Sequence, residues 1–406
     1  MSIPAVDHES ATTPAENHQP AVEKLRVLHI NSGNLYGGVE TILVTLARLR
    51  GLCPAMEPHF ALCHDGRLRE ELRDSGVPVY TLGKVRISRP WTVWRARRRL
   101  REVLRQERFG LVICHMPWSL AVFGKAVRDQ GQPLGFWAHA FHDGRNWLEW
   151  LARRIRPDVA IGNSNYTEAG LGNFFPDVKR GVIYPPVVLS ASPEADQWRS
   201  MVRKELRANN DTVAIIQVGR LEAGKGHVCH LRALSLLKDS NRWVYWIVGG
   251  AQRPQEQEYL NLLQDTAAEL GITDRVRFLG ERADIRQLLM GADIFCQPNV
   301  HPESFGIVFI EALWAGLPVV TSGIGGALEI IDGSCGVLIR PGNTQLLAES
   351  LRKLIESREL RVRLGEAGAK RAGRLSDPAT QMEKLRKLSL DLLRISVDQP
   401  KEYNLR

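Results

Sequence analysis

Hydrophobic positions in the first half of the chain fall into short runs that alternate with segments of helical spacing. The first run, 25–30, leads into a glycine-rich turn at 31–38 and then into a helical pattern at 39–50. Short apolar runs bounded by polar residues predict buried strands. The later runs are 59–63, 77–82, 111–115, 134–138 and 159–161. Strands that alternate with helices predict a parallel sheet with helices on both faces.

The same pattern begins again after Pro185-Pro186. Its strand-like runs are 213–218, 243–248, 276–279, 294–298, 317–321 and 336–339. We therefore expect an α/β fold of two facing, doubly wound, Rossmann-like domains, with ligands bound in the cleft between them. The expected boundaries are a disordered tail at 1–22, an N-terminal domain at 23–187, a C-terminal domain at 188–375, and a helical segment at 376–406 that could pack back on the N-terminal domain.

Length and composition agree with two globular domains. The chain has 406 residues, of which 44% are hydrophobic and 24% charged. The best candidate for a membrane-spanning helix, 306–322, is interrupted by Glu311 and Pro318, so none is expected. The N-terminal residues lack the basic start and apolar core of a secretory signal. Six cysteines without a C-x-x-C pair argue against disulfides and a cysteine zinc site, and favour the cytoplasm.

The net charge of +9 is concentrated in the segment 84–108, which holds ten basic and two acidic residues. Trp91 and Trp94 lie near its start, and an apolar stripe at helical spacing follows at 100–104. This predicts a helix that either rests on an anionic membrane, with tryptophan at the interface, or packs its stripe on its own domain. Nucleic acid is a third partner that suits such a face, although no nucleic acid is expected as a partner of the protein.

A basic, glycine-containing turn occupies residues 219–226, after one predicted strand and before a helix. Gly224 and Gly226 allow a tight backbone turn. Arg220 can hold a phosphate through two nitrogens, Lys225 adds a second charge, and a helix N-terminus offers free N–H groups to an anion. The turn matches neither a Walker loop nor G-x-G-x-x-G, so it predicts either a phosphate site or simply a turn.

A second motif, 302–311, follows the predicted strand at 294–298. Glu303 lies in a loop, and Glu311 lies in the second turn of a helix expected to begin near residue 305. Both carboxylates could face one cleft and accept hydroxyl groups of a sugar or a ribose, because a buried carboxylate needs such partners. The alternative is a helix cap at Glu303 and a surface or ion-paired Glu311.

These motifs together resemble the retaining glycosyltransferase family 4, whose members have the GT-B architecture of two facing Rossmann-like domains. The resemblance covers residues 25–375, and its most specific part is the pair of glutamates. It differs at 326–329, where family members often have proline before the glutamate, and this difference is expected to affect the local turn more than catalysis. The matching stretches are 37–40, 219–220, 225–226, 292–295, 303–311, 315–320 and 342–343.

The resemblance implies a role for four side chains. Arg220 and Lys225 would neutralise the diphosphate of a nucleotide-sugar donor. Glu311 would bind the ribose hydroxyls, and Glu303 would contact the donor sugar as a catalytic residue. Since the reaction expels a nucleoside diphosphate from an anomeric carbon, positive charge at the leaving group is what the chemistry requires.

The resemblance also implies two backbone contributions to donor diphosphate binding. Phe305, Gly306 and Ile307 would offer N–H groups to the diphosphate. Gly37 and Gly38 would let the N-terminal loop approach the donor and the acceptor closely.

A histidine at the end of the strand 134–138 contacts the donor sugar in the resembling family. His139 matches this position best because it follows the apolar run directly, and we expect it to be catalytic. His142, beside Asp143, is the competing candidate. Ser164 is expected to cap a helix rather than to contact a ligand.

The N-terminal half shows no second carboxylate suited to act as a nucleophile, as retaining hydrolases require. We therefore expect same-face transfer, in which the departing phosphate helps to deprotonate the acceptor. No D-x-D motif occurs in the chain, so no metal or other cofactor is expected.

The sequence thus predicts a cytoplasmic retaining glycosyltransferase, peripheral to the inner membrane if segment 84–108 binds it. The donor would be a UDP- or GDP-linked sugar, and the acceptor a glycan or a lipid-linked sugar. One alternative is a GT-B nucleotide-sugar epimerase, which would release no nucleotide when an acceptor is supplied. The other is a non-catalytic anion-binding scaffold on the same fold, against which the intact charged residues argue.

Overall fold

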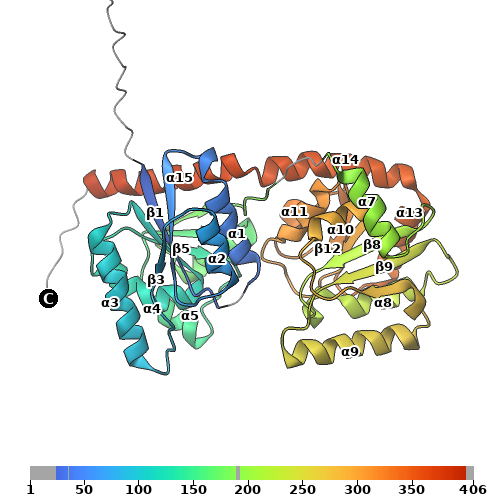
Figure 1. The fold of residues 1–406 in the computed structure, drawn as a ribbon, viewed down its shortest axis with the longest axis horizontal. Coiled ribbons are helices and arrows are strands. Elements are labelled where there is room, and N and C mark those ends of the chain that lie inside the picture. Colours follow the sequence, from blue (N-terminus) through green and yellow to red (C-terminus); the bar gives the residue numbers. More distant parts are fainter. Residues whose placement is uncertain (1–23, 35, 189–192, 399–406) are drawn as a thin grey trace, which may run out of the picture.

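The computed structural model describes residues 24–34, 36–188 and 193–398, and Figure 1 shows two α/β units side by side. Each unit is a single parallel sheet with helices on its faces, which confirms the predicted fold class. The predicted tail at 1–22, part of the expected junction between the domains, and the last eight residues lie outside the described residues.

The N-terminal sheet has the strand order β3-β2-β1-β4-β5-β6-β7. Its strands are β1 (Leu25–Asn31), β2 (Met56–Leu62), β3 (Val79–Thr81), β4 (Leu111–His115), β5 (Leu134–Ala138), β6 (Val159–Gly162) and β7 (Lys179–Val182). Its helices are α1 (Gly38–Arg48), α2 (Arg67–Asp74), α3 (Pro90–Gln106), α4 (Met116–Arg128), α5 (Trp147–Arg153) and α6 (Asn165–Phe174), with a 3₁₀ turn η1 (Arg50–Leu52). The strand order reverses direction between β1 and β4, where a doubly wound sheet opens a crevice at its carboxyl edge.

The C-terminal sheet has the order β10-β9-β8-β11-β12-β13 and reverses between β8 and β11. Its strands are β8 (Val213–Val218), β9 (Trp243–Val248), β10 (Val276–Phe278), β11 (Ile294–Gln297), β12 (Val319–Ser322) and β13 (Gly336–Ile339). Its helices are α7 (Ala195–Glu205), α8 (His227–Ser235), α9 (Pro254–Glu269), α10 (Ile285–Gly291), α11 (Ile307–Trp314), α12 (Ala327–Ile330), α13 (Thr344–Glu356) and α14 (Arg358–Leu375), with 3₁₀ turns η2 (Ala223–Lys225) and η3 (Thr273–Arg275).

Two secondary-structure elements differ from those predicted from the sequence. Strand β7 was not predicted, because its sequence Lys-Arg-Gly-Val has no apolar run and its place at the sheet edge leaves it largely exposed. Helix α11 begins at Ile307 rather than near residue 305, since Gly306 adopts a left-handed conformation (φ 100°) that ends the preceding loop. Phe305 is therefore a buried loop residue.

The chain returns to the N-terminal domain at its end. Helix α15 (Pro378–Asp398) continues the line of α14 along one side of both units in Figure 1. Its side chains Met382, Leu385 and Leu392 pack in the same apolar cluster as Leu25 and Leu111 of the N-terminal sheet. This helix therefore covers the N-terminal domain after the chain has completed the C-terminal one. Among the described helices, none is long and apolar enough to cross a membrane.

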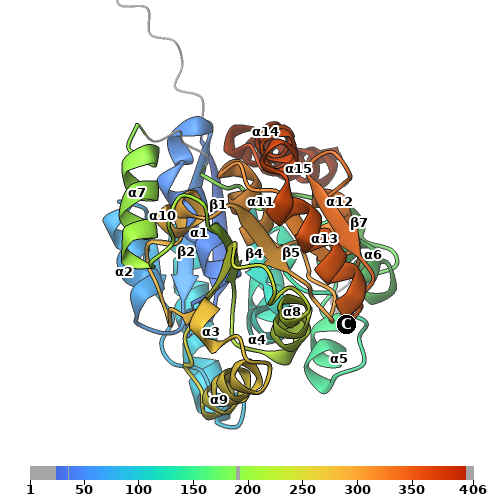
Figure 2. The same cartoon turned by 90° about the vertical axis from the view of Figure 1, so that its right-hand side faces the viewer.

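The two domains are also joined near their cleft by one carboxylate. Glu329, at the end of α12, accepts hydrogen bonds from the backbone N–H groups of Asn165 (2.8 Å) and Tyr166 (2.9 Å) at the start of α6. The Asn165 amide (2.7 Å) and the Tyr184 hydroxyl (3.0 Å) also donate to it. A helix N-terminus attracts negative charge, so α6 and Glu329 are matched electrostatically. Figure 2 shows α12, β7 and α6 along the same flank of the molecule.

A second contact lies beside this one. Ser164 caps α6 by accepting the Thr167 N–H, as predicted, and its hydroxyl also donates to the Ser304 carbonyl (2.5 Å) in the loop before α11. The turn at 325–326 is tied to the same loop, because Gly326 N–H donates to the Glu303 carbonyl (2.8 Å). Glu329 therefore holds an interface that includes the loop of the second sequence motif, a role that the sequence did not reveal.

Replacing Glu329 by Ala should lower the free energy of unfolding by about 2 kcal/mol, because hydrogen bonds to a charged group contribute about 1.5–3 kcal/mol net. The domains should also separate more readily, which small-angle scattering would show as a larger radius of gyration. Glu366→Ala, at an exposed position of α14, is the matched control. Unchanged urea and scattering curves for Glu329→Ala would contradict this role.

Candidate functional site

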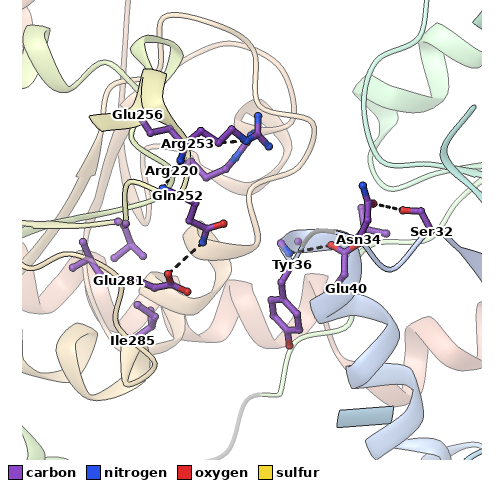
Figure 3. Close-up of a pocket in the computed structure, with 18 of the residues that line it drawn as sticks. Ser32, Asn34, Tyr36, Glu40, Arg220, Gln252, Arg253, Glu256, Glu281 and Ile285 are labelled. Carbon is purple, nitrogen blue, oxygen red and sulfur yellow. Dashed lines mark hydrogen bonds and ion pairs between the residues drawn. The ribbon is translucent and has the colours of Figure 1, made fainter. Parts of the chain in front are cut away.

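A cleft with a cavity of about 640 Å³ opens between the two domains, at the carboxyl edges of the sheets. In Figure 3, Asn34, Tyr36 and Glu40 of the N-terminal domain face Arg220 and Gln252 of the C-terminal domain. We call this space the outer cavity. Two adjoining cavities of about 670 and 460 Å³, here called the inner cavities, are lined by residues that follow β5, β8 and β11.

The structure brings the predicted site residues together around these cavities. Arg220 borders all three. Lys225, Glu303 and His139 border both inner cavities. Gly37 borders the outer cavity, and Gly38 borders the outer one and an inner one. The inner cavity with Gly38 is also lined by Phe305, Gly306, Ile307 and Glu311. The roles implied for these residues remain predictions.

Lys225 and Glu303 form an ion pair, with 2.5 Å between Nζ and Oε2. The Asn299 amide donates to the same carboxylate oxygen (3.4 Å). Gln217, at the base of the turn, donates to the Lys225 carbonyl (2.9 Å) and so fixes the backbone that carries the lysine. Cation and carboxylate are mutually neutralised without a ligand, and a donor must exchange part of this bond for contacts of its own.

The basic turn is shaped by close backbone packing. Gly226 has a left-handed conformation (φ 73°), and a Cβ there would overlap the carbonyl of Pro298. Lys225 ends the 3₁₀ turn η2, and α8 begins at His227. Arg220 remains largely exposed, 3.3 Å from Glu222, so its guanidinium is free to turn toward an anion in the cleft.

Glu311 lies in the second turn of α11, as predicted, and borders one inner cavity. The residue as a whole is partly exposed, whereas its carboxyl group is buried among protein atoms. This burial raises the pKa of Glu311 to about 7. A carboxylate held in such surroundings is ready to accept two hydrogen bonds from a diol such as a ribose.

His139 follows β5 and is buried at the edge of the inner cavities. Burial lowers its pKa to about 3, so the imidazole is neutral and acts as a hydrogen-bonding group rather than as an acid. The competing His142 bonds to Glu149 (2.8 Å), whose other oxygen accepts the Gly144 N–H. His142 therefore supports the loop after β5.

The outer cavity includes residues to which the sequence assigned no role. Asn31, Tyr36 and Trp118 line its N-terminal wall, and Gln252 and Arg253 line the opposite wall. They lie at the end of a strand, in loops or in a first helical turn, and no local pattern marks such scattered positions. Glu40, within a matching stretch, accepts the Gly37 N–H (3.0 Å), and burial raises its pKa.

Within the described part of the chain, no group of three or more histidine, cysteine, aspartate or glutamate side chains is arranged to hold a metal ion.

Comparisons with known proteins identify the family of the chain. The family model "Glycosyl transferases group 1" matches residues 199–371, and "Glycosyltransferase Family 4" matches residues 36–191. The D-inositol 3-phosphate glycosyltransferase of Corynebacterium glutamicum strain R is 32% identical over 300 residues, or 67% of this chain and 70% of the relative. The lipopolysaccharide glucosyltransferase WaaG of Escherichia coli K12 is 31% identical over 194 residues, or 46% of this chain and 50% of WaaG.

Solved structures share the fold. A glycosyltransferase from Rickettsia africae has a TM-score of 0.80 at 20% identity and covers 91% of this chain and 99% of its own. Anabaena Alr3699/HepE in complex with UDP and glucose has a TM-score of 0.76 at 24% identity and covers 90% and 99%. Fold and site thus define a GT-B glycosyltransferase. The chain belongs to glycosyltransferase family 4, and it is an enzyme that transfers a sugar.

Glu311→Gln should stabilise the ligand-free protein at alkaline pH and weaken nucleotide binding. Because the pKa of about 7 in the folded state lies above the ordinary 4.5, ionisation costs folded-state stability as pH rises through this window. The melting temperature of the variant should therefore exceed that of the wild type most at pH 8, with a difference that shrinks toward pH 4.5. Thermal melts over this range measure the effect.

If Glu311 holds a ribose, as the resemblance implies, the same variant should also lose much of its stabilisation by a nucleoside diphosphate, since a neutral amide accepts ribose hydroxyls less well than a carboxylate. Glu366→Gln, on exposed α14, is the control and should show neither effect. Equal melting temperatures of Glu311→Gln and wild type at every pH would contradict the buried, proton-binding carboxyl group.

Proposed function

We propose that this protein transfers a sugar from a UDP- or GDP-linked donor to a hydroxyl group of a glycan or lipid-linked acceptor, with retention of anomeric configuration. One observation carries the proposal: adjoining cavities of one cleft are lined by Arg220, Lys225, Glu303 and Glu311. Two cations and two carboxylates in this arrangement suit a diphosphate with a hydroxyl-bearing group on each side.

The leaving group is neutralised by the C-terminal domain. Arg220 and Lys225 contact the diphosphate, and the N–H groups at the start of α11, from Gly306 and Ile307, add a positive helix end. Glu311 binds the ribose, and Glu303 contacts the sugar once Lys225 has turned toward the phosphate. No metal is needed, because these groups supply the charge that a divalent ion would otherwise provide.

The residues that would face the donor sugar support same-face transfer without a covalent intermediate. Among the described residues that line the inner cavities, those of the N-terminal domain include His139 and Tyr166 but no carboxylate. A covalent intermediate on that side therefore lacks its nucleophile. The departing phosphate takes the acceptor proton, and the acceptor oxygen attacks from the face that the phosphate leaves.

The acceptor is an uncharged, hydroxyl-rich group. The N-terminal wall of the outer cavity carries amide, hydroxyl and aromatic side chains, from Asn31, Ser32, Tyr36 and Trp118, beside the carboxyl group of Glu40, which is bonded to the Gly37 N–H. The arginines that line this cavity within the described residues all belong to the C-terminal domain. An inositol phosphate, the acceptor suggested by the names of several relatives, finds no cation on this wall, whereas a neutral sugar finds hydrogen bonds and an aromatic face.

Donor binding is measured by thermal stability in the presence of UDP, GDP, ADP and their sugar conjugates. At about a hundred times its dissociation constant, the correct nucleotide should add about 2.7 kcal/mol. Lys225→Ala and Arg220→Ala should lose this stabilisation, because both cations contact the diphosphate. Lys238→Ala, at an exposed position after α8, should keep it.

The stabilisation should persist when EDTA is added, and the transferred sugar should keep its anomeric configuration by proton NMR. Nucleotide release that needs an acceptor distinguishes transfer from epimerisation. Binding that is retained in both variants, or that EDTA abolishes, would contradict the proposed site.

We also propose that α3 brings the enzyme to an anionic membrane at which a lipid-linked acceptor lies, on the cytoplasmic side. The apolar stripe of the helix is not available for insertion, because Leu100 and Leu104 are buried in the core of the domain and Arg97 donates to the Val122 carbonyl (2.5 Å). Trp91 and Trp94 are instead 56% and 60% exposed near the start of this basic helix. Exposed tryptophan beside arginine suits the interface of an anionic bilayer.

Sedimentation with vesicles of phosphatidylglycerol and phosphatidylcholine tests this contact. Replacing Trp91 and Trp94 together by Ala should weaken binding about tenfold, and added salt should weaken it further. Leu262→Ala, at a half-exposed apolar position of the C-terminal domain, is the control. Equal binding of the double variant and the wild type would rule out α3 as the contact.

A further inference from the structure

Three histidines form a buried hydrogen-bonded row in the N-terminal domain. His29 lies in β1, His115 ends β4, and His139 follows β5. Because β1, β4 and β5 are neighbours in the sheet, the three imidazoles come from successive strands. His29 Nδ1 lies 2.9 Å from His115 Nε2, and His115 Nδ1 lies 2.8 Å from His139 Nε2.

The row is enclosed by aromatic rings and by the sheet. Trp137 stacks on His115 and His139, with ring centres 5.4 and 5.6 Å apart, and Phe60 stacks on His29 at 5.4 Å. All three imidazoles are buried. Burial, with the neighbouring histidines, lowers the pKa of each of them, to about 3 for His29 and His139. The three rings are therefore neutral near pH 7, and each carries one N–H.

The direction of the two bonds couples the three protons. Each bond joins Nδ1 of one ring to Nε2 of the next, so both bonds form only when all three rings carry the proton on the same kind of nitrogen. If all are protonated at Nε2, His139 Nδ1 is an acceptor. If all are protonated at Nδ1, His139 Nδ1 is a donor. Any mixed set leaves at least one nitrogen pair with two protons or with none, which is costly in a buried site.

One nitrogen at each end of the row takes part in neither of these two hydrogen bonds. His139 Nδ1 and His29 Nε2 are buried, and each lacks a hydrogen-bond partner among the described residues. His139 borders the inner cavities, whereas His29 lines none of the cleft cavities. Because His139 borders these cavities, a hydroxyl group bound beside its ring could supply the partner that the buried Nδ1 lacks.

We propose that His115 and His29 are positioning residues that hold His139 in one tautomer, so that its Nδ1 meets a hydroxyl of the donor sugar in a defined hydrogen-bonding direction. The contact with the sugar rests on the proposed function, whereas the coupling of the three rings does not. A sugar hydroxyl bound at His139 selects the tautomer of the whole row, including His29 two hydrogen bonds away.

Nitrogen-15 NMR of the full-length, histidine-labelled protein tests the coupling without any ligand. Long-range proton–nitrogen spectra identify which nitrogen of each ring carries the proton. His29, His115 and His139 should all show the same tautomer. A mixed set would overturn the proposal, whatever the enzyme transfers.

Matched variants then test whether His29 and His115 determine the tautomer of His139. His29→Phe keeps an aromatic ring on Phe60, removes only the far bond, and should bring the two ring-nitrogen shifts of His139 closer together. His115→Phe should have the same effect on His139 and lower kcat/KM about tenfold, with the loss mainly in kcat. His59→Phe is the control, because His59 bonds to Tyr80 (3.1 Å) rather than to the row.

A purely structural role predicts a different result for His29→Phe: a lower melting temperature with unchanged nitrogen shifts at His139. That result would also overturn the proposal. Should the variants be too unstable to study, the ligand-free spectrum of the wild type still decides. Like tautomers in a protein that binds no sugar nucleotide would support the coupling and count against the proposed function instead.

Discussion

The two parallel sheets present their carboxyl edges to one another, and the site depends on this arrangement. Each sheet reverses its strand order near its middle, between β1 and β4 and between β8 and β11, so that the loops on either side of the reversal diverge and leave room for a ligand. Arg220 and Lys225 follow β8, Glu303 follows β11, and His139 follows β5. His139 and Glu303, which are 164 positions apart along the sequence, thus line one cleft.

Contacts between the domains hold the carboxyl edges of the two sheets next to one another. Helix α15 packs the end of the chain on the N-terminal core, and Glu329 binds the start of α6. The loop that carries Glu303 lies between the two domains. The Glu303 carbonyl accepts a hydrogen bond from the Gly326 N–H, and the Ser304 carbonyl accepts one from the Ser164 hydroxyl. The loop that carries Glu303 is therefore in direct hydrogen-bond contact with the N-terminal domain.

The two walls of the cleft carry different kinds of side chain. The C-terminal wall holds the charged groups that suit a nucleoside diphosphate, with Lys225 and Glu303 paired at 2.5 Å. The N-terminal wall carries amide, hydroxyl and aromatic groups together with the buried carboxyl group of Glu40, and His139 is kept uncharged by burial. In the proposed transfer the charged wall lies at the leaving group, where negative charge develops on phosphate oxygens.

The sequence by itself determined the class of fold and the charged part of the site. Alternating apolar runs and helical segments predicted both sheets, because buried parallel strands must be apolar, and only the exposed edge strand β7 was missed. Local motifs likewise marked Arg220, Lys225, Glu303 and Glu311. Only the tertiary structure decided which groups meet across strands and domains: the pairing of Glu329 with α6 and the row of His29, His115 and His139. These contacts join residues that are 24 to 164 positions apart, so no local pattern records them, and their hydrogen bonds exist only once the strands have found their neighbours.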